Sequence, residues 1–259
     1  TQSPSSAASD VYKRQISVRL RGTAGQSLGA FATQGLRLEV IGDANDYVGK
    51  GLSGGTIIVR PSAAAAFVAH ENTIIGNTVL YGATSGKLFA AGQAGERLCV
   101  RNSGATAIVE GAGTNACEYM TGGRVVILGE VGDNFGAGMT GGMAFVYDSD
   151  GRFMDRVNPE SLQVVRIGKS HWEAELKGLV EAHAEATDSA LAARLLNEWD
   201  VEIGKFWQVV PTEIVPRLEM PLSNEEGGAA GWQDTRLTSS PAPGLLPGLL
   251  IVVCKSKFG

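Results

Sequence analysis

The chain has 259 residues, 44% of them hydrophobic, and a formal net charge of −5. This size and apolar content allow a sizeable core, and the mildly acidic balance argues against a nucleic-acid-binding surface. The sequence holds no apolar run long enough to cross a bilayer, so we expect no membrane-spanning helix. Residues 1–15 lack the apolar centre of a signal peptide, so we expect a protein that is not secreted.

Glycine is unusually frequent, at 35 residues, which is about twice its ordinary usage. Most of these glycines precede residue 152 and alternate with valine, isoleucine and leucine. This pattern indicates a β structure rich in turns rather than a disordered chain.

In chain order, residues 1–15 are polar and rich in serine and alanine, and we expect a disordered or extraneous leader. Apolar and polar residues alternate in Ile16–Leu20 and again in Leu36–Ile41, which predicts two strands. Between them, the glycines of Gly22–Phe31 have the spacing G-x-x-G-x-x-x-G. This segment lacks the lysine of a phosphate-binding loop, so the spacing favours a turn.

From Gly42 to Asp148, a Ser/Thr-Gly pair recurs just before each apolar run. The glycines of these pairs have the numbers 54, 86, 104, 122 and 141, so the last three steps between them are nearly equal and the first is longer. A fixed period of this length is typical of repeat architectures, and it is too short for a helical hairpin repeat. The longer first step is interpreted as one turn plus an insertion, which we place at Pro61–Thr73.

The segments between these glycines are short and β-branched, as in Thr56–Val59, and they predict strands. About three strands of about five residues fit one such repeat. We therefore predict a mainly β fold, with a right-handed parallel β-helix over residues 16–168. Glycine suits its corners because it reaches positive φ without a Cβ penalty, and Asn115 and Asn134 tolerate the same conformation. The predicted structural corners are Gly54, Gly55, Gly86, Gly104, Gly122, Gly123, Gly141 and Gly142.

The three cysteines form no CxxC pair, so the sequence predicts neither a zinc site nor an iron–sulfur site. Cys99 and Cys117 are one repeat apart, and Cys254 lies far outside the repeats. We interpret the first two as stacked core thiols in a reducing compartment, although stacking also brings them near disulfide distance.

A short helical hairpin is expected over residues 169–216, after the β pattern ends. Ser170 and Glu173 have the spacing of a capping box, and apolar residues follow at helical intervals. We expect the hairpin to close the end of the coil or to dock on a neighbour.

The second helix of this hairpin is expected to start around Thr187–Ser189. It would carry Leu191 to Phe206 on one side and stop before Pro211. Residues 217–259 show no periodicity, so we expect them to be a disordered or extraneous tail.

No residue is predicted to be catalytic. None of the three histidines has a nearby partner for a nucleophile arrangement, so structural or surface roles are expected for His70, His171 and His183. Asp43 and Asp46 lie between glycines and favour ordinary turn chemistry over a calcium loop or an acid–base pair. Four arginines are interpreted as separate solvated side chains rather than one face toward an acidic partner. They are Arg60, Arg97, Arg101 and Arg124.

Six long segments carry a resemblance to a known family. They are Arg21–Phe31, Gly42–Gly55, Ile75–Gly86, Arg101–Ala105, Cys117–Gly123 and Phe135–Gly142. Together they resemble the C-terminal GXGXG β-helix domain of the glutamate synthase large subunit. The resemblance continues through Asn158–Glu160 and covers roughly residues 16–216.

The resemblance implies a non-catalytic role. Complete enzymes of this family convert glutamine and 2-oxoglutarate into two glutamates. Their amidotransferase domain releases ammonia, and their barrel domain holds FMN and an iron–sulfur cluster. The resembling domain packs between these two domains and supports the ammonia path, so no catalytic or cofactor-binding residue is carried over to this chain.

The partners that the resemblance implies are those two domains of the same subunit, with a small reductase subunit as a further candidate. Neither nucleic acid nor membrane is expected as a partner. The implied location is the cytoplasm or a plastid, and the electron donor stays open between a pyridine nucleotide and ferredoxin.

Three alternatives stay open beside this one. A polysaccharide-acting β-helix enzyme needs an acidic and basic groove and usually a secretion signal. A left-handed acyltransferase coil needs an aliphatic residue at every sixth position, and that pattern fails after Tyr81. A formylmethanofuran dehydrogenase subunit shares the glycine-rich domain but would lack the helices that follow Ser170.

Overall fold

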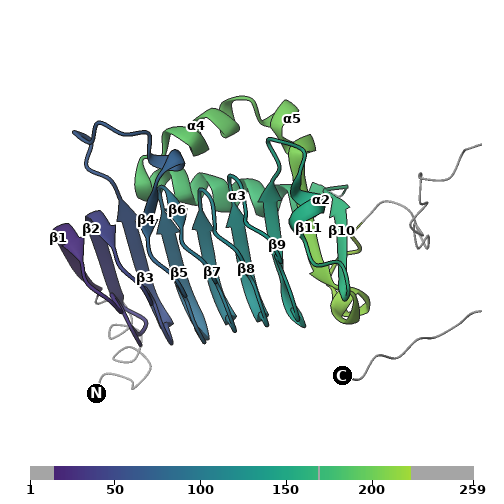
Figure 1. The fold of residues 1–259 in the computed structure, drawn as a ribbon, viewed down its shortest axis with the longest axis horizontal. Helices are drawn as coiled ribbons and strands as arrows, with labels where there is room; N and C mark the ends of the chain where they lie inside the picture. The colour runs from purple at the N-terminus through teal and green to yellow at the C-terminus, as the bar shows by residue number, and fades with distance from the viewer. Residues whose placement is uncertain (1–14, 169, 223–259) are drawn as a thin grey trace, which may run out of the picture. The chain divides into compact units, whose positions relative to one another are not determined.

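The computed structural model describes residues 15–168 and 170–222. In this part of the chain, successive strands stack side by side, with helices along one side of the stack (Figure 1). The stacked strands, paired in parallel, are β1 (Ile16–Ala24), β2 (Leu36–Ala44), β3 (Ser53–Arg60), β5 (Ser85–Ala90), β7 (Ser103–Val109), β8 (Thr121–Ile127) and β9 (Gly141–Tyr147). The prediction of a parallel β-helix is therefore confirmed.

A second, shorter ladder follows another side of the same turns. It consists of β4 (Thr73–Ile75) and β6 (Gln93–Ala94), which pair in parallel, and single bridges extend it from Ala94 to Ala112 and on to Val131. The insertion expected at Pro61–Thr73 is an edge loop that contains only the short 3₁₀ helix η1 (Ala69–Glu71) before β4 begins.

The strand register places like residues above one another. One row that faces the interior of the coil is Leu38, Ile57, Leu88, Ala107, Val125 and Ala144. Most of this row is fully buried, because each aliphatic side chain packs on the equivalent side chain of the next turn. The interior core of the coil is thus built by repetition, and removal of its apolar surface from water stabilises every turn.

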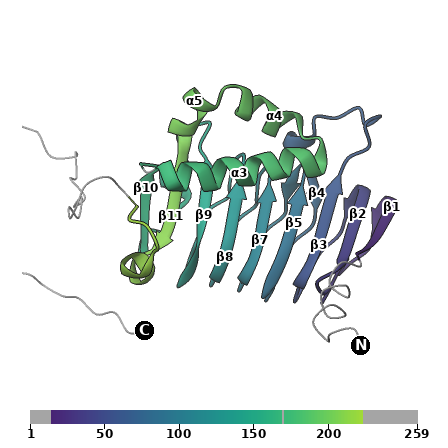
Figure 2. The same ribbon diagram turned by 180° about the vertical axis from the view of Figure 1, so that it is seen from behind.

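A second core lies on the outer face of the same strands. Ile58, Phe89, Ile108, Val126 and Phe145 point away from the coil interior and pack against helices. Helix α3 (Ser170–Thr187) runs across this face, as Figure 2 shows from behind. Its own buried residues are Trp172, Leu176, Val180, His183 and Thr187.

The helices differ in two ways from the sequence-based expectation. They cover the side of the coil and do not close its end, since the outward rows of the strands are as apolar as the inward rows and need a cover. The first helix starts at Ser170 as expected, but the Glu173 carboxylate accepts from the Trp199 indole N–H at 3.1 Å. Glu173 thus ties α3 to α5 (Trp199–Glu202), which follows α4 (Ala190–Asn197) in the chain.

The end of the coil is closed by strands. After α5 and the 3₁₀ helix η2 (Ile203–Lys205), the chain forms β11 (Phe206–Pro211), which pairs antiparallel with β9 and with β10 (Leu162–Arg166). Phe206 therefore does not continue the second helix, and that prediction was wrong. Aromatic and β-branched residues follow it as far as Val210, and such a run favours a strand.

The packed part of the chain extends a little beyond the expected boundary at residue 217. The short helix α2 (Phe153–Arg156) precedes β10, and the 3₁₀ helix η3 (Thr212–Arg217) follows β11. The Trp172 indole N–H then donates to the Pro221 carbonyl at 3.0 Å, and Leu222 is buried. The expected leader, apart from residue 15, and the rest of the expected tail lie outside the described residues.

Candidate functional site

The eight predicted corner glycines lie within the first three residues of strands β3, β5, β7, β8 and β9. Four of them have the positive φ for which glycine was expected: 124° at Gly54, 107° at Gly86, 94° at Gly123 and 81° at Gly142. The other four do not have positive φ and need a different explanation.

That explanation is the close approach of successive turns. A Cβ added at Gly122 would lie 2.8 Å from the carbonyl carbon of Ser103 and closer still to its oxygen. The same relation holds for Gly141 above Thr121, where the Cβ would lie 2.7 Å from the carbonyl carbon. Because non-bonded carbon atoms prefer about 3.5–4.0 Å, no side chain fits there without separating the turns.

The turn that leads into each strand shows a regularity that reasoning from the sequence missed. In every turn, three residues at alternate positions adopt positive φ, such as Asn115, Cys117 and Tyr119. Their amides bond alternately to the turn ahead and the turn behind: Asn115 donates to Asp133 at 2.9 Å and Cys117 to Leu98 at 2.7 Å. The recurring G-x-G spacing at Gly49–Gly51 and Gly136–Gly138 was the available signal.

Cys99 and Cys117 occupy the middle position of this turn in consecutive repeats, so they stack as predicted. Both are free and fully buried. Burial raises the pKa of each thiol, and the neighbouring Cys117 raises the pKa of Cys99 further. These thiols are therefore protonated core residues, and two of them do not supply the four cysteine ligands of an iron–sulfur cluster.

A buried polar cluster lies where the α3–α4 turn meets the coil. The Glu110 carboxylate accepts a hydrogen bond from the Ser189 hydroxyl, and its Oε1 lies 3.3 Å from His183 Nε2. The Ser189 oxygen also accepts from the Ala192 amide at 3.0 Å, as the N-cap of α4. All three side chains of the cluster are buried.

The order of groups in this cluster decides its chemistry. Glu110 stands between Ser189 and His183, so the imidazole does not reach the hydroxyl as a general base would in a nucleophile arrangement. The cluster instead fixes the end of α3 and the start of α4 to Glu110, which directly follows strand β7. Beside it lies a cleft of about 350 Å³ between the 61–70 loop and the α3–α4 turn.

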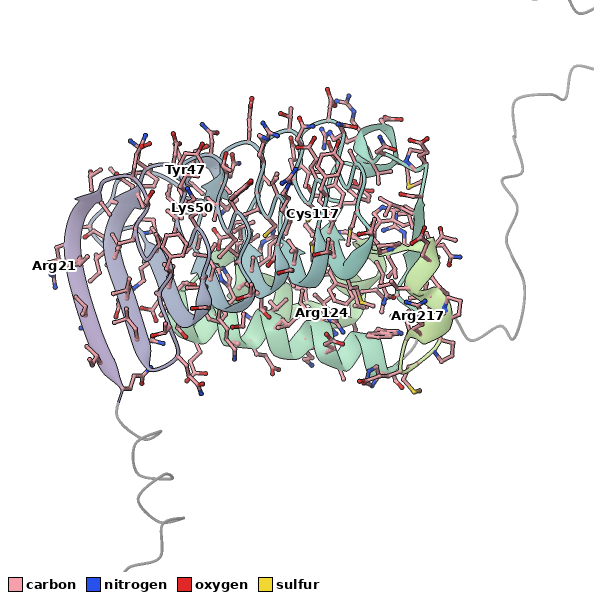
Figure 3. The ribbon with its side chains drawn as sticks, turned by 90° about the horizontal axis from the view of Figure 1, so that it is seen from below. Arg21, Tyr47, Lys50, Cys117, Arg124 and Arg217 are labelled. Carbon is pink, nitrogen blue, oxygen red and sulfur yellow. The ribbon has the colours of Figure 1, made fainter. Side chains whose placement is uncertain are left out.

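Three of the four arginines form ion pairs. Arg60 pairs with Glu39 at 3.2 Å and with Asp188 at 3.1 Å, Arg97 pairs with Glu118, and Arg124 pairs with Glu175. Arg101 is exposed. Figure 3 shows Arg124 on the helix side of the coil, whereas Tyr47 and Lys50 lie at the opposite edge. The prediction of solvated arginines was therefore wrong for Arg60 and Arg124, which are partly buried in ion pairs, whereas Arg97 is paired but exposed.

The other singled-out side chains have ordinary structural roles. Asp46 Oδ1 accepts from the Asn77 amide at 2.8 Å, which is turn chemistry as predicted, and Asp43 is exposed. The His70 carbonyl accepts from Gln93, while the exposed His171 packs edge-on against Trp172. Within residues 15–168 and 170–222, no group of three His, Cys, Asp or Glu side chains is placed to hold a metal ion.

In the part of the chain that the structure describes, no helix is both long enough and apolar enough to cross a membrane.

Comparisons with known proteins agree with this architecture. The sequence model of the family described as GXGXG motif matches residues 5–212. The chain is 66% identical to the large chain of the NADPH glutamate synthase of Azospirillum brasilense, over 80% of this chain and 14% of that protein. It is 52% identical to a ferredoxin-dependent glutamate synthase of Pyropia yezoensis, over 77% of this chain and 13% of that protein.

A third relative is the ferredoxin-dependent glutamate synthase 1, chloroplastic/mitochondrial, of Arabidopsis thaliana, which is 51% identical over 77% of this chain and 12% of its own length. The chain thus spans about one seventh or less of the length of these relatives. The relatives are glutamate synthases, and they give no support to the alternative β-helix proteins.

Proposed function

The chain belongs to the GXGXG motif family, and from this premise we propose that it is a non-catalytic structural domain of a glutamate synthase large subunit. In that enzyme, glutamine and 2-oxoglutarate become two glutamates. The proposed role of this domain is to hold the ammonia-releasing domain and the flavin domain at a fixed spacing.

The observation that carries the proposal is the contact between backbones at the corners. Gly122 and Gly141 leave no room for a methyl group against the carbonyl of the preceding turn. Backbone amides also bond from turn to turn: Cys117 donates to Leu98 of the turn behind it, and Asn115 donates to Asp133 of the turn ahead. A stack of turns in direct backbone contact resists compression and sliding, because protein interiors packed at this density deform little.

Stiffness matters for this role because ammonia must pass between two domains without loss to solvent. A spacer that bends would open the path. The complete enzyme's FMN and iron–sulfur cluster belong, in this proposal, to other domains, since the described residues offer no ligand set that fits a cluster. The partners proposed are the amidotransferase and FMN domains, in the cytoplasm or a plastid.

A chimera tests the proposal. Residues 16–216 replace the matching segment of the Azospirillum brasilense large chain, and Gly122→Val is introduced in the chimera. The unaltered chimera is expected to form glutamate with nearly one glutamine consumed per 2-oxoglutarate aminated. The variant is expected to consume glutamine in excess, because the valine side chain clashes with the Ser103 carbonyl of the preceding turn and loosens the spacer.

Gly178→Ala is the matched control, since a Cβ at Gly178 on α3 would meet no atom within 4 Å. This control variant is expected to behave like the unaltered chimera. Unchanged thermal stability and unchanged coupling in the Gly122→Val chimera would refute the proposed role.

A further inference from the structure

We propose that the free edge of β1 is a docking surface for one further turn of the coil. The occupant is a parallel strand, with the turn that follows it, from the longer polypeptide of which this chain is a part. It places aliphatic side chains toward the coil interior and a carboxylate outward beside Arg19. The proposed function enters only in taking the chain as part of a longer polypeptide.

The first support is the exposure of the interior row at β1. Ile16, Val18 and Leu20 stand in register with Leu36, Leu38 and Val40 of β2, so they belong to the row that is buried elsewhere in the coil. They are exposed by 67%, 36% and 41%, whereas Val40 and its successor Val59 are fully buried. Within the described residues β1 pairs with β2 alone, so its other edge leaves both apolar side chains and backbone groups uncovered.

The second support comes from a column of glycines. The shorter ladder, extended back to β1 and β2, pairs one residue of each turn with the equivalent residue of the next. The residue that follows each of these paired residues is glycine in every turn but one. These following residues are Gly25, Asn45, Gly76, Gly95, Gly113 and Gly132. A Cβ at Gly76 would lie 2.8 Å from the carbonyl carbon of Asn45, and a Cβ at Gly132 would lie 2.7 Å from that of Gly113. The glycines at 76, 95, 113 and 132 all lie directly against the backbone of the preceding turn.

Gly25 is the member of this column for which the described residues give no such reason. A Cβ there would meet no atom within 4 Å, and its φ is not positive. Gly22 differs from Gly25, because its positive φ of 102° accounts for that glycine without a neighbouring turn. The geometry at Gly25 therefore fits a preceding turn that packs on it.

The third support is the alternation of charge. On the outer face, Glu39 lies between Arg19 and Arg60, at 3.0 Å and 3.2 Å. Arg19 is still 65% exposed in its side chain, so a carboxylate on the next strand would continue the alternation. A second copy of this chain does not fit, because β1 against β1 brings arginines 19 and 21 toward their own equivalents, and like charges on adjacent strands repel.

The test uses the 259-residue chain and a synthetic peptide with the sequence of residues 34–52. This peptide is a natural turn of the same coil and supplies Leu38 opposite Val18, Glu39 opposite Arg19 and Asn45 opposite Gly25. Hydrogen exchange of residues 16–24 is measured with and without the peptide. Exchange is expected to slow about tenfold when the peptide is at ten times its Kd.

Two substitutions make the test specific. Glu39→Lys in the peptide is expected to weaken binding at least about tenfold through repulsion with Arg19. Gly25→Ala in the chain is expected not to lower its melting temperature. It is expected to weaken binding to a similar degree, because the methyl group meets the backbone of the docked turn. Gly178→Ala, on α3, is the matched control and is expected to bind normally.

Several results would overturn the proposal. One is an edge that stays unprotected up to the solubility limit of the peptide, and another is equal binding of the Glu39→Lys peptide. A third is slow exchange of residues 16–24 without peptide. If residues 1–14 are protected at the same time, that segment is the occupant, and if light scattering shows a dimer, the occupant is a second copy of the chain. None of these results involves glutamine turnover, so they are distinct from failure of the proposed function.

Discussion

Gly122→Ala is expected to lower the free energy of unfolding by about 2–3 kcal/mol. The added Cβ would lie 2.8 Å from the Ser103 carbonyl carbon, so β8 must move away from β7 by nearly 1 Å to restore about 3.5–4.0 Å. This movement strains the corner bonds from the Thr121 and Gly122 amides to the Asn102 carbonyl, now 2.9 Å and 3.2 Å. Each lost backbone bond costs about 1 kcal/mol.

Two other contributions to the effect of alanine at position 122, backbone strain and the entropy of the unfolded chain, are small. The φ of Gly122 is not in the positive range, so alanine adds no backbone strain. The loss of chain freedom in the unfolded state stabilises the alanine variant by about 0.4–1 kcal/mol. The steric cost therefore prevails, and the melting temperature is expected to fall by about 4–12 °C for a domain of this size.

The assay is urea unfolding of the purified chain, followed by tryptophan fluorescence, with Gly25→Ala as the matched control. A Cβ at Gly25 meets no atom within 4 Å, so this variant gains the unfolded-state effect without the clash. The midpoint is expected to fall for Gly122→Ala with the slope unchanged. If the two variants agree within about 0.5 kcal/mol, the contact between turns does not explain the glycines.

Glu110→Ala should lower the free energy of unfolding by about 2–4 kcal/mol in the same assay, since it leaves the Ser189 hydroxyl and His183 Nε2 buried without their partner; an effect no larger than that of Glu130→Ala, at an exposed residue, would contradict this. Cys99 and Cys117 should react with a thiol reagent only after unfolding, because burial raises their pKa values, and prompt reaction of both in a Cys254→Ser chain would be inconsistent with a closed core. Burial raises the pKa of Glu39, but Arg19 and Arg60 lower it more, so the folded pKa lies below the unfolded pKa of about 4.3. The ionised carboxylate therefore stabilises the fold above the unfolded pKa, and this stabilisation is lost as the pH falls through the folded pKa. The difference in unfolding free energy between the chain and its Glu39→Gln variant should therefore shrink between about pH 6 and pH 3, and a constant difference would show that the arginines do not act on Glu39.

The coil itself could be predicted because the glycine pattern repeats in the sequence with the period of one turn. One turn repeats at a nearly constant interval through Gly104, Gly122 and Gly141, and the same period places Cys117 above Cys99. The reason for the glycines was only half predictable. Positive φ is a local property of the chain, whereas the approach of a carbonyl from the preceding turn depends on how tightly the turns stack.

The helices were less predictable than the coil. Helical spacing in Trp172, Leu176 and Val180 says that one face is buried, but not which surface buries it. Phe206 fits the stripe of the second helix and the start of a strand equally well, and only pairing with Tyr147 decides between them. Tertiary pairing overrode the local pattern there.

The polar cluster under α4 was not predictable from local sequence. Glu110 is 73 residues from His183 and 79 from Ser189, and each of the three lies in an ordinary local pattern. The turn between α3 and α4 must return to the coil before these side chains meet. Only the fold brings them together.

The two ends of the coil differ in structure, and this difference decides at which end a further parallel turn can be added. At the β9 end, β11 runs antiparallel, the Trp207 indole N–H donates to Asp148 at 2.8 Å, and Arg166 covers the Trp207 ring at 3.6 Å. Parallel stacking cannot continue past a strand of reversed direction. At the other end, β1 keeps the direction and register of the strands that follow it.

In a stack where each turn contacts only its neighbours, the terminal turn has one stabilising interface instead of two. The closed end compensates with the antiparallel pair and the helices, whereas β1 has β2 alone among the described strands. The turn from Ile16 to Phe31 should therefore open first when the chain is held by itself. Since its exposed row and Gly25 already match a further turn, added chain at this edge would convert the weakest turn into an interior one.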